Sequence, residues 1–547
     1  MSSEHEEIAV ETGRPVARRY VAMLVIGAAV AQALGVAIKS PTQLEANDIS
    51  RWCTVWSLLE QGTYAIDDCP WQARTQDKVL HQDKIVSPDA PAAVSGQPQK
   101  TKEKGWPDAR RNAAGTPDPS VKASWLARLE YRLAPQSWRA DPAQNDEPPT
   151  WHFYSSKPPL LPTMIAGALY PFRKVSGIPL GREILTDRAP RNVQKIDPDH
   201  PGEFKYELET PKEKIKWPVY VFYFKPIVLF LNIVPMLFFL IFYARLLDRL
   251  ATNDWAWMAS LFAGAWGTLL FAFDQTLNNH TVAAYSAFFA LYATIKIFDD
   301  EAPSRRTYMA AGFWASFCAC NELPAALFGA LLFVCVFVRS PGRTLAYFVP
   351  MAAIPVIAFL ATQYAAMGQF TPAYEDFGTA AYEYQGSVWQ TPLEFDYLNK
   401  VPETKGVYLI HMLIGHHGVF SLTPILVFSI IGAFAAFAGR SRGVKVVAVQ
   451  TLLLTIAMFA FYDWNPKARN YGGSTQGLRW LFWLIPFWMV TLPAGIAPGG
   501  TRPIYRGLTL AALMASVFSV GYALRHPWSH PWILDLMEQA GMYSLKR

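Results

Sequence analysis

Cysteine and charge are both scarce in this chain. The 547 residues include five cysteines, and charged residues make up 17% of the sequence against 52% for apolar residues. The formal net charge is +6, but the lysines and arginines form no basic block with interleaved aromatic residues. This pattern argues against a nucleic-acid partner. The cysteines have no spacing typical of a metal site. We expect no cofactor; the sequence leaves a divalent metal open but does not support one.

The cysteines fall into two groups. Cys318, Cys320 and Cys335 lie within apolar segments, where cysteine usually acts as a small packing residue. Cys53 and Cys69 share one polar loop. Their placement is consistent with two free thiols or, in an oxidising compartment, with a disulfide.

Long apolar runs, by contrast, are abundant. A run of about twenty apolar residues spans the hydrocarbon core of a bilayer, and a helix satisfies its own backbone hydrogen bonds there. We therefore predict an all-α, polytopic membrane protein with about eleven transmembrane helices. The predicted spans are 20–38, 220–243, 255–272, 281–298, 307–320, 323–338, 344–364, 418–438, 444–462, 479–497 and 507–524.

The short connections between these spans predict the orientation. Cytoplasmic connections are enriched in lysine and arginine, and alternate connections of this chain are basic. The basic residues are Arg245, Arg249, Arg305, Arg306, Arg339, Arg343, Arg440, Arg442, Lys445, Arg502 and Arg506. The pattern predicts a plasma (inner) membrane protein with a cytoplasmic N-terminus and an extracytoplasmic C-terminus.

The same pattern divides the chain into five parts. They are a cytoplasmic tail (1–19), a first transmembrane helix (20–38), an extracytoplasmic loop (39–217), a helix bundle (218–524) and an extracytoplasmic tail (525–547). Within the loop, residues 72–150 are rich in Pro, Gln and charge, so we expect a flexible insertion. Leu160–Phe172 is apolar but too short to span, so we expect a helix in the membrane interface.

Two charged residues of the extracytoplasmic loop are candidates for chemistry. Asp48 lies in the first turn of a predicted amphipathic helix, where the helix dipole favours a carboxylate; alternatively, Asn47 or Asp48 caps that helix. Lys157 precedes two prolines and the interfacial helix. Its ammonium either binds a phosphate or anchors the helix as a snorkelling lysine. We interpret Lys225, at the end of a span, as snorkelling.

Further polar residues collect on the predicted extracytoplasmic face. Asn279 and His280 lie at the end of a span, and Glu322 lies between two apolar runs. An ionisable residue at such a depth usually faces a cavity, although a buried carboxyl satisfied by its neighbours fits equally. A third segment has the spacing His-x4-His-His, which does not favour a zinc site. Its histidines are His411, His416 and His417.

The loop 463–479 is glycine-rich and basic, and it contains Arg469, Tyr471 and Arg479. Such a loop can hold a phosphate through backbone amides and guanidinium groups. An ordinary turn with interfacial arginines has the same composition. The loop lacks the lysine-serine ending of a nucleotide-binding loop.

Three motifs resemble a known family. Asn47-Asp48-Ile49-Ser50-Arg51, Glu60-Gln61-Gly62-Thr63-Tyr64 and Tyr154-Ser155-Ser156-Lys157-Pro158-Pro159 resemble the N-terminal part of GT-C glycosyltransferases. Protein O-mannosyltransferases and aminoarabinose lipid A transferases are the most similar branch. The resemblance implies that Asp48 is the catalytic carboxylate and that Lys157 binds the donor phosphate. Ile49 replaces a second acidic residue common in the family, and the insertion between Gly62 and Lys157 is unusual.

We therefore predict a glycosyltransferase that moves a sugar from a polyprenyl-phosphate donor to an acceptor hydroxyl on a glycan, lipid or protein. Asp48 would act as the base, and Lys157, Arg469 and Arg479 would bind the donor phosphate. The residues expected around the substrate are Arg51, Asn279, His280, Glu322 and Tyr471. The alternatives are a transporter of envelope lipid or glycan, which should have polar groups on both faces, and a non-enzymatic membrane assembly protein.

Overall fold

The computed structural model describes residues 2–40, 45–86, 125–140, 150–187, 191–196, 204–209, 214–376, 380–382, 384, 387, 403–464 and 469–542. This part of the chain is mostly helical. Eight of its helical segments are long and apolar enough to cross a membrane, which confirms the prediction of a helical, polytopic membrane protein. They are Val16–Lys39, Tyr220–Leu250, Asp254–Phe273, His280–Asp299, Pro341–Met367, Arg442–Trp464, Arg479–Gly500 and Pro503–Ala523.

The other predicted spans form shorter helices, one over Arg305–Asn321 and two within the apolar segments Leu323–Arg339 and Pro424–Ala438. The α-helices of the bundle are α1 (Ser2–Lys39), α5 (Tyr220–Val228), α6 (Val234–Leu250), α7 (Asp254–Trp266), α8 (Leu270–Phe273), α9 (His280–Asp299), α10 (Arg305–Asn321), α11 (Ala326–Arg339), α12 (Pro341–Arg343), α13 (Val349–Met367), α14 (Lys405–Leu413), α15 (Val419–Leu422), α16 (Val427–Ala435), α17 (Arg442–Trp464), α18 (Ile485–Ile496) and α19 (Pro503–Ala523).

Small residues allow some of these helices to pack backbone against backbone. A Cβ atom on Gly495 of α18 would lie 1.8 Å from the carbonyl oxygen of Phe428 of α16. A Cβ on Gly432 would lie 2.0 Å from the carbonyl oxygen of Thr491. Close approach through small residues is typical of helices that pack inside a membrane.

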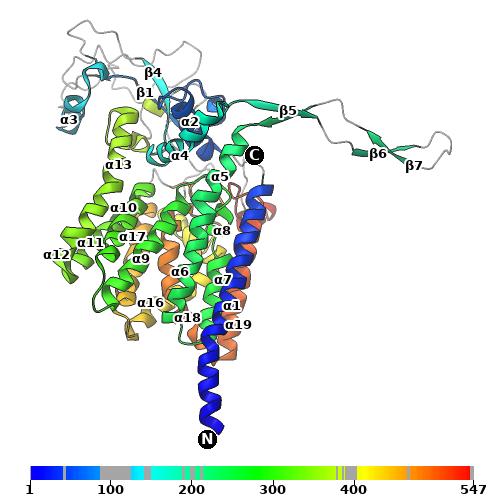
Figure 1. Ribbon diagram of the computed structural model, residues 1–547, viewed down its shortest axis with the longest axis vertical. Helices are drawn as coiled ribbons and strands as arrows, with labels where there is room; N and C mark the ends of the chain where they lie inside the picture. Colours follow the sequence, from blue (N-terminus) through cyan, green and yellow to red (C-terminus); the bar gives the residue numbers. More distant parts are fainter. Residues whose placement is uncertain are drawn as a thin grey trace.

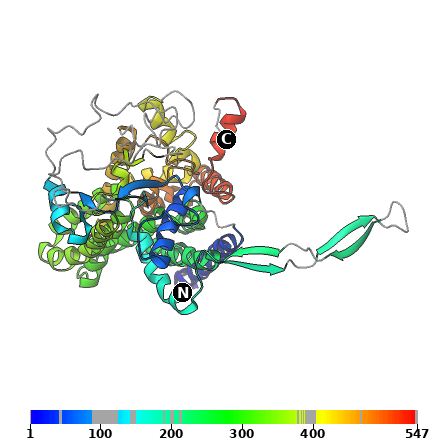
Figure 2. The same ribbon diagram turned by 90° about the horizontal axis from the view of Figure 1, so that it is seen from above.

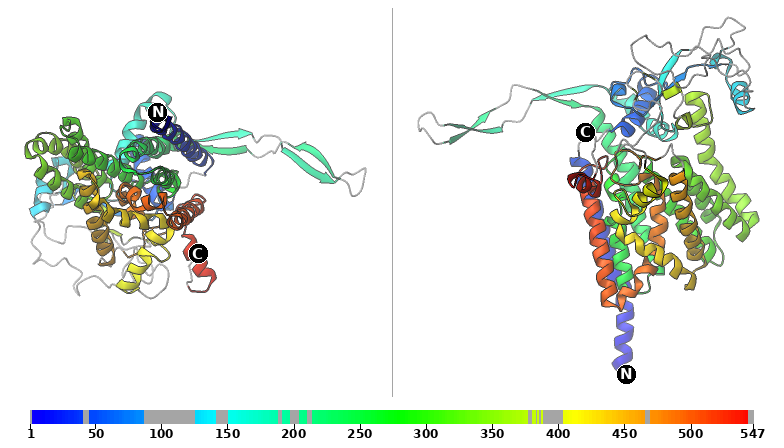
Figure 3. Two further views of the ribbon diagram at one scale, coloured as in Figure 1. Left: turned by 90° about the horizontal axis from the view of Figure 1, so that it is seen from below. Right: turned by 180° about the vertical axis from the view of Figure 1, so that it is seen from behind.

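Two helices, α2 (Ala46–Glu60) and α4 (Leu160–Ser176), cover one end of the bundle, and the N-terminus of α1 projects from the opposite end (Figures 1 and 3). We call the covered end the α2 end. Buried apolar side chains join α2 to α4 and α5, among them Trp52, Leu161 and Phe224. The predicted interfacial helix thus forms as α4, packed against α2 at this end of the bundle.

Strands occur in the described residues only between positions 78 and 218. β1 (Lys78–Gln82) pairs antiparallel with β4 (Trp151–Ser155), and β2 (Ile85–Val86) pairs in parallel with β3 (Arg139–Ala140). Two further antiparallel pairs extend away from the bundle (Figure 2). They are β5 (Glu183–Asp187) with β8 (Lys214–Pro218) and β6 (Arg191–Ile196) with β7 (Phe204–Glu209).

The expectation of a flexible insertion over 72–150 is wrong for its described parts, 72–86 and 125–140, which contain strands and the helix α3 (Trp125–Leu133). The reason is that distant segments supply the apolar partners: Val79 of β1 is buried in one cluster with Tyr154 and Met367. Average composition does not detect such burial. The remainder of the predicted insertion, 87–124 and 141–149, lies outside the described residues.

Two interpretations from the sequence change in the structure. Lys225 donates hydrogen bonds of 2.5 Å to the carbonyl oxygens of Ala37 and Ser40. The structure thus gives this lysine a specific partner, the C-terminal end of α1, whose last carbonyls need donors. Cys53 and Cys69 are buried as free thiols, so no disulfide joins them.

Candidate functional site

Asp48 lies in the first turn of α2, and Arg51 lies in the next turn. The residue that precedes the helix is Glu45, whose side chain makes no capping hydrogen bond. The alternative of a cap by Asn47 or Asp48 is therefore wrong: both lie inside the helix. Their side chains have other partners, since Asn47 accepts from the guanidinium of Arg51 and Asp48 Oδ2 accepts from Trp528 Nε1 at 3.0 Å.

Asp48 is fully buried, and its second carboxylate oxygen, Oδ1, has no hydrogen-bond partner among the described residues. Burial raises the pKa of Asp48 well above its ordinary value, whereas the charge of Arg51, the Trp528 N–H and the charge of Arg479 act in the opposite direction. A buried polar atom without a partner is costly. Oδ1 is therefore available to a ligand that donates a proton or a hydrogen bond.

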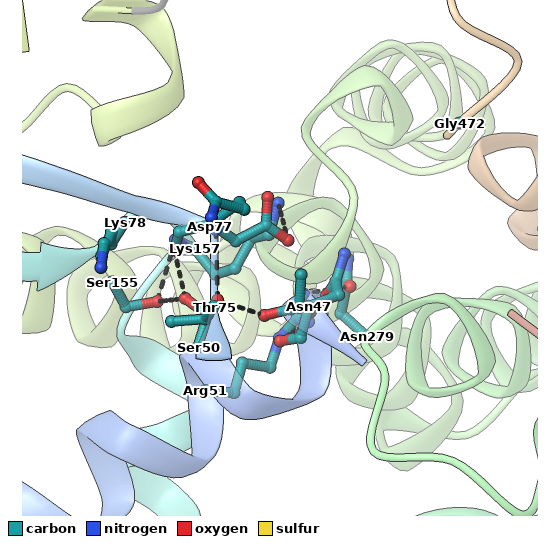
Figure 4. A network of polar contacts seen from close by, with 12 residues as sticks. Asn47, Ser50, Arg51, Thr75, Asp77, Lys78, Ser155, Lys157, Asn279 and Gly472 are labelled. Atoms are coloured by element: carbon teal, nitrogen blue, oxygen red, sulfur yellow. Dashed lines mark hydrogen bonds and ion pairs between the residues drawn. The ribbon is translucent and has the colours of Figure 1, made fainter. Parts of the chain in front are cut away.

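Lys157 is held beside Asp48's helix by a carboxylate that sequence analysis missed. Its Nζ lies 3.2 Å from Asp77 Oδ2. Ser50 of α2 donates a 2.5 Å hydrogen bond to the Asp77 carbonyl and shares a 2.6 Å hydrogen bond with the Ser155 hydroxyl (Figure 4). Thus α2 fixes the paired ends of β1 and β4 together. A snorkelling role for Lys157 does not fit, because its ammonium is largely buried against Asp77.

The opposite wall of the site comes from the start of α9 and the end of α10. Arg51 donates to Asn279 Oδ1, and Asn279 Nδ2 donates to Glu322 Oε1 at 2.8 Å. His280 Nδ1 also contacts Glu322 Oε1. Burial raises the pKa of Glu322, which lies between α10 and the next helical turn, to about 8, against the opposing charges of Arg479 and Arg51. Burial thus favours the protonated form of Glu322.

Arg479 completes the cluster from the short 3-10 segment η12 (Arg479–Leu484). Its Nε donates to the Gly472 carbonyl at 2.9 Å, and its Nη1 lies 3.3 Å from His280 Nε2. The guanidinium lies over the indole of Trp528, 4.8 Å from the ring centre, as in a cation–π contact. Trp528 therefore contacts both Asp48 and Arg479.

The structure thus brings together most of the predicted site. Arg51 and Arg479 act on the buried Asp48 carboxylate, and Lys157, which is paired with Asp77, lies within the field of the same two arginines. We call this group the Asp48 cluster; its members are Asp48, Arg51, Asp77, Lys157, Asn279, His280, Glu322, Arg479 and Trp528. A positively charged, buried group of this kind suits an anionic ligand such as a phosphate.

Two predicted residues do not join the Asp48 cluster. Arg469 Nε donates to the carbonyl of Asp463, the end of α17, at 3.0 Å. Tyr471 stacks on His417, with ring centres 4.8 Å apart, and its hydroxyl donates to Glu403. The two arginines of the predicted phosphate-binding loop therefore have different partners, and of the two only Arg479 belongs to the cluster.

Asp77 and Trp528 are the functional candidates that the sequence did not identify. Asp77 lies in the stretch whose composition suggested disorder. Trp528 follows a proline in the C-terminal tail, which the charge pattern predicts on the same face as Asp48. The sequence signal that could have identified Trp528 is the presence of an aromatic residue in that tail.

A small, mostly apolar crevice of about 20 Å³ is lined by Leu478, the residue before Arg479. Gly477 forms part of its wall, and a Cβ there would lie 2.6 Å from Leu269 Cδ1. Its aliphatic lining includes Leu269, Leu422, Leu426, Leu478, Leu481 and Ile485. The charged cluster thus adjoins an apolar surface.

No family model matches the chain, and no curated protein or solved structure is significantly similar to it. The resemblance to GT-C glycosyltransferases is therefore still a prediction, and the function must be argued from the site itself.

Proposed function

We propose that this protein is a glycosyltransferase that moves a sugar from a polyprenyl-phosphate donor to an acceptor hydroxyl on the extracytoplasmic face of the plasma membrane. The observation that carries the proposal is the Asp48 Oδ1 atom. It is buried and without a partner among the described residues, within the field of Arg51 and Arg479, and the same two arginines act on Lys157. A base surrounded by cations suits a reaction in which a hydroxyl attacks and a phosphate departs.

In the proposed step, Asp48 Oδ1 accepts the proton of the acceptor hydroxyl. The acceptor oxygen forms a bond to the anomeric carbon, and the bond from that carbon to the donor phosphate breaks. The electron pair leaves with the phosphate oxygen, and the sugar inverts its configuration. The raised pKa of Asp48 makes its carboxylate a stronger base than an exposed aspartate.

The departing polyprenyl phosphate gains negative charge, and Lys157 and Arg479 are the cations proposed to stabilise it. Their fixed partners support this role. Lys157 is positioned by Asp77, and Arg479 by the Gly472 carbonyl and the Trp528 ring. Preorganised cations need not reorganise when the bond breaks.

A lipid-linked donor is supported by the eight helices long enough to cross a membrane and by the apolar side chains that neighbour Arg479 in the chain, Leu478 and Leu481. A lipid chain that lies along these apolar side chains would bring its phosphate towards Arg479. Water-soluble nucleotide sugars would gain nothing from such a surface.

Mass spectrometry of envelope lipids, glycans and glycoproteins tests the proposal. We compare cells with the wild-type chain, cells without it, and cells with Asp48→Asn. A hexose or pentose addition should be present with the wild type and absent in the other two. Asp67→Asn is the matched control, because Asp67 is also a hydrogen-bonded carboxylate near α2 but pairs with His152 outside the cluster.

If Asp48→Asn retained the full glycosylation pattern of the wild type, the assignment of Asp48 as the base would be wrong. If the cells without the chain also retained it, the transferase proposal itself would fail. An unchanged pattern together with a changed distribution of lipid between membrane leaflets would instead favour a transporter.

A further inference from the structure

A second polar group lies at the α2 end, outside the Asp48 cluster. Glu403, His411 and His416 each offer one metal-ligating atom, and these atoms all lie within 4.8 Å of one another. His416 is buried, and the other two residues are partly buried. We call these three residues the Glu403 triad. The proposed transfer reaction makes no use of it.

The local backbone brings the two histidines together. His411 lies in α14, and the chain turns back directly after this helix, so that the His416 ring stacks on the His411 ring with centres 4.0 Å apart. Gly415 permits this return: a Cβ atom there would lie 2.7 Å from the Cα of His411. The turn at Gly415, and not the sequence spacing alone, therefore brings the rings of His411 and His416 together.

Outer contacts hold two of the three candidate ligands. His417 Nδ1 lies 2.6 Å from His416 Nδ1, so a metal on His416 would be bound through Nε2. Tyr471 donates its hydroxyl to Glu403 Oε2, so a metal on Glu403 would be bound through Oε1. Metal-binding histidines and carboxylates usually have such partners, which fix the tautomer and the orientation of the ligand.

We propose that Glu403, His411 and His416 bind one divalent transition-metal ion of the zinc class. Two imidazole nitrogens and one carboxylate oxygen form a set that zinc accepts, with a fourth position left for water or another ligand. Magnesium and calcium prefer oxygen ligands throughout, so the two imidazoles select against them. The proposal does not depend on the transfer reaction.

The metal would act at a distance from the reacting groups. Tyr471 begins a turn with left-handed backbone angles, φ 54° at Tyr471, 89° at Gly472 and 79° at Gly473. Tyr471 holds Glu403 on one side of this turn, and the Gly472 carbonyl accepts from Arg479 on the other. An ion on the Glu403 triad would therefore fix the turn that positions Arg479.

Metal binding is measured on the full chain, purified without a histidine tag and stripped with a chelator. Zinc is added, unbound ion is removed, and bound zinc is counted by mass spectrometry; cobalt is used in parallel for its visible absorption. We expect about one ion per wild-type chain and a cobalt spectrum typical of a four-coordinate site. Wild-type protein that retains no zinc and gives no such spectrum would overturn the proposal without any variant.

Variants then locate the site. His411→Ala and His416→Ala should lower the zinc affinity by a hundredfold or more, and Tyr471→Phe by about ten- to a hundredfold through the lost contact to Glu403. His152→Ala is the matched control, because His152 also lies beside a carboxylate, Asp67, and should bind zinc like the wild type. Zinc should also raise the unfolding temperature of the wild type and of the control. Equal zinc binding by His416→Ala and the wild type would show adventitious binding only.

Discussion

The two polar groups at the α2 end are assembled in opposite ways. The Asp48 cluster takes its charged residues from segments hundreds of positions apart, with Asp48 at the start of the chain and Trp528 near its end. The Glu403 triad comes from one short stretch, 403–416. The first group exists only when the whole bundle is folded, whereas the second depends on one turn. The comparison predicts that substitutions in the two groups have different effects on transfer and on zinc binding.

The largest effect is expected at the centre of the Asp48 cluster. Asp48→Asn keeps the shape of the side chain and removes its basicity. The turnover of purified protein should fall by roughly 10²–10⁴-fold, the range for loss of a general base. The affinity for a polyprenyl-phosphate donor should change little, because the effect is on the reaction and not on binding.

The control for this prediction is Asp67→Asn, which should keep wild-type turnover. Equal losses in turnover and in donor affinity would contradict the assignment, since they would indicate that Asp48 supports the fold of the site. Asp48→Asn should also bind zinc like the wild type if the two groups are as separate as their construction indicates.

A smaller effect is expected for the cation at the edge of the cluster. Lys157→Ala should weaken donor binding by about ten- to a hundredfold, since a contact to a charged group contributes roughly 1.5–3 kcal/mol. Lys157→Arg should restore part of the affinity. Binding of the donor lipid in detergent measures both. Lys174→Ala, in the last turn of α4, is the control.

The Asp77 contact complicates this measurement, because Lys157→Ala leaves a buried carboxylate without its partner. A double-mutant cycle with Asp77→Asn separates the two causes. If Lys157→Ala weakens binding only while Asp77 is charged, Lys157 neutralises Asp77 and does not bind the donor phosphate.

The same comparison explains what the sequence could predict. Apolar length and the side of each connection are local properties, so the helices and the shared face of Asn279, His280 and Glu322 were predictable. Which arginine of the loop 463–479 reaches the site was not, because only the packing of Arg479 on Trp528 distinguishes it from Arg469.

The failure to predict Asp77 has the same physical origin. Asp77 belongs to a strand end whose order comes from pairing with β4, about seventy residues away in the chain. The Glu403 triad was missed for a different reason: the histidine spacing was visible, but the return of the chain at Gly415 and the position of Glu403 are properties of the folded loop.

A more moderate effect should appear in the pH dependence. Burial raises the pKa of Asp48 well above its ordinary value, and the Trp528 N–H lowers it. Since the base must be deprotonated, turnover should decline as the pH falls through this raised pKa. Trp528→Phe removes the hydrogen bond, so the pKa should rise further and the acid limb should move upward by roughly 0.5–1 pH unit.

Turnover of Trp528→Phe at alkaline pH should stay close to that of the wild type, because the carboxylate is then ionised in both. The control is Trp532→Phe, in the same C-terminal segment, whose indole donates to Ser519; it should leave the profile unchanged. A profile that moved downward for Trp528→Phe would contradict the contact to Asp48.

The smallest effect on transfer is expected at the residue that joins the two groups. Tyr471→Phe removes the hydroxyl that holds Glu403, so the turn that positions Arg479 through the Gly472 carbonyl becomes less fixed. At saturating zinc, turnover should fall by roughly two- to fivefold, as for the loss of one hydrogen bond. Tyr522→Phe, which removes a hydroxyl donated to Asp535, is the control.

The decisive measurement repeats Tyr471→Phe in an Arg479→Ala background. If the turn acts through Arg479, Tyr471→Phe should cause no further loss there, because coupled residues are not additive. The same two- to fivefold loss in both backgrounds would show that the Glu403 triad and the Asp48 cluster are independent.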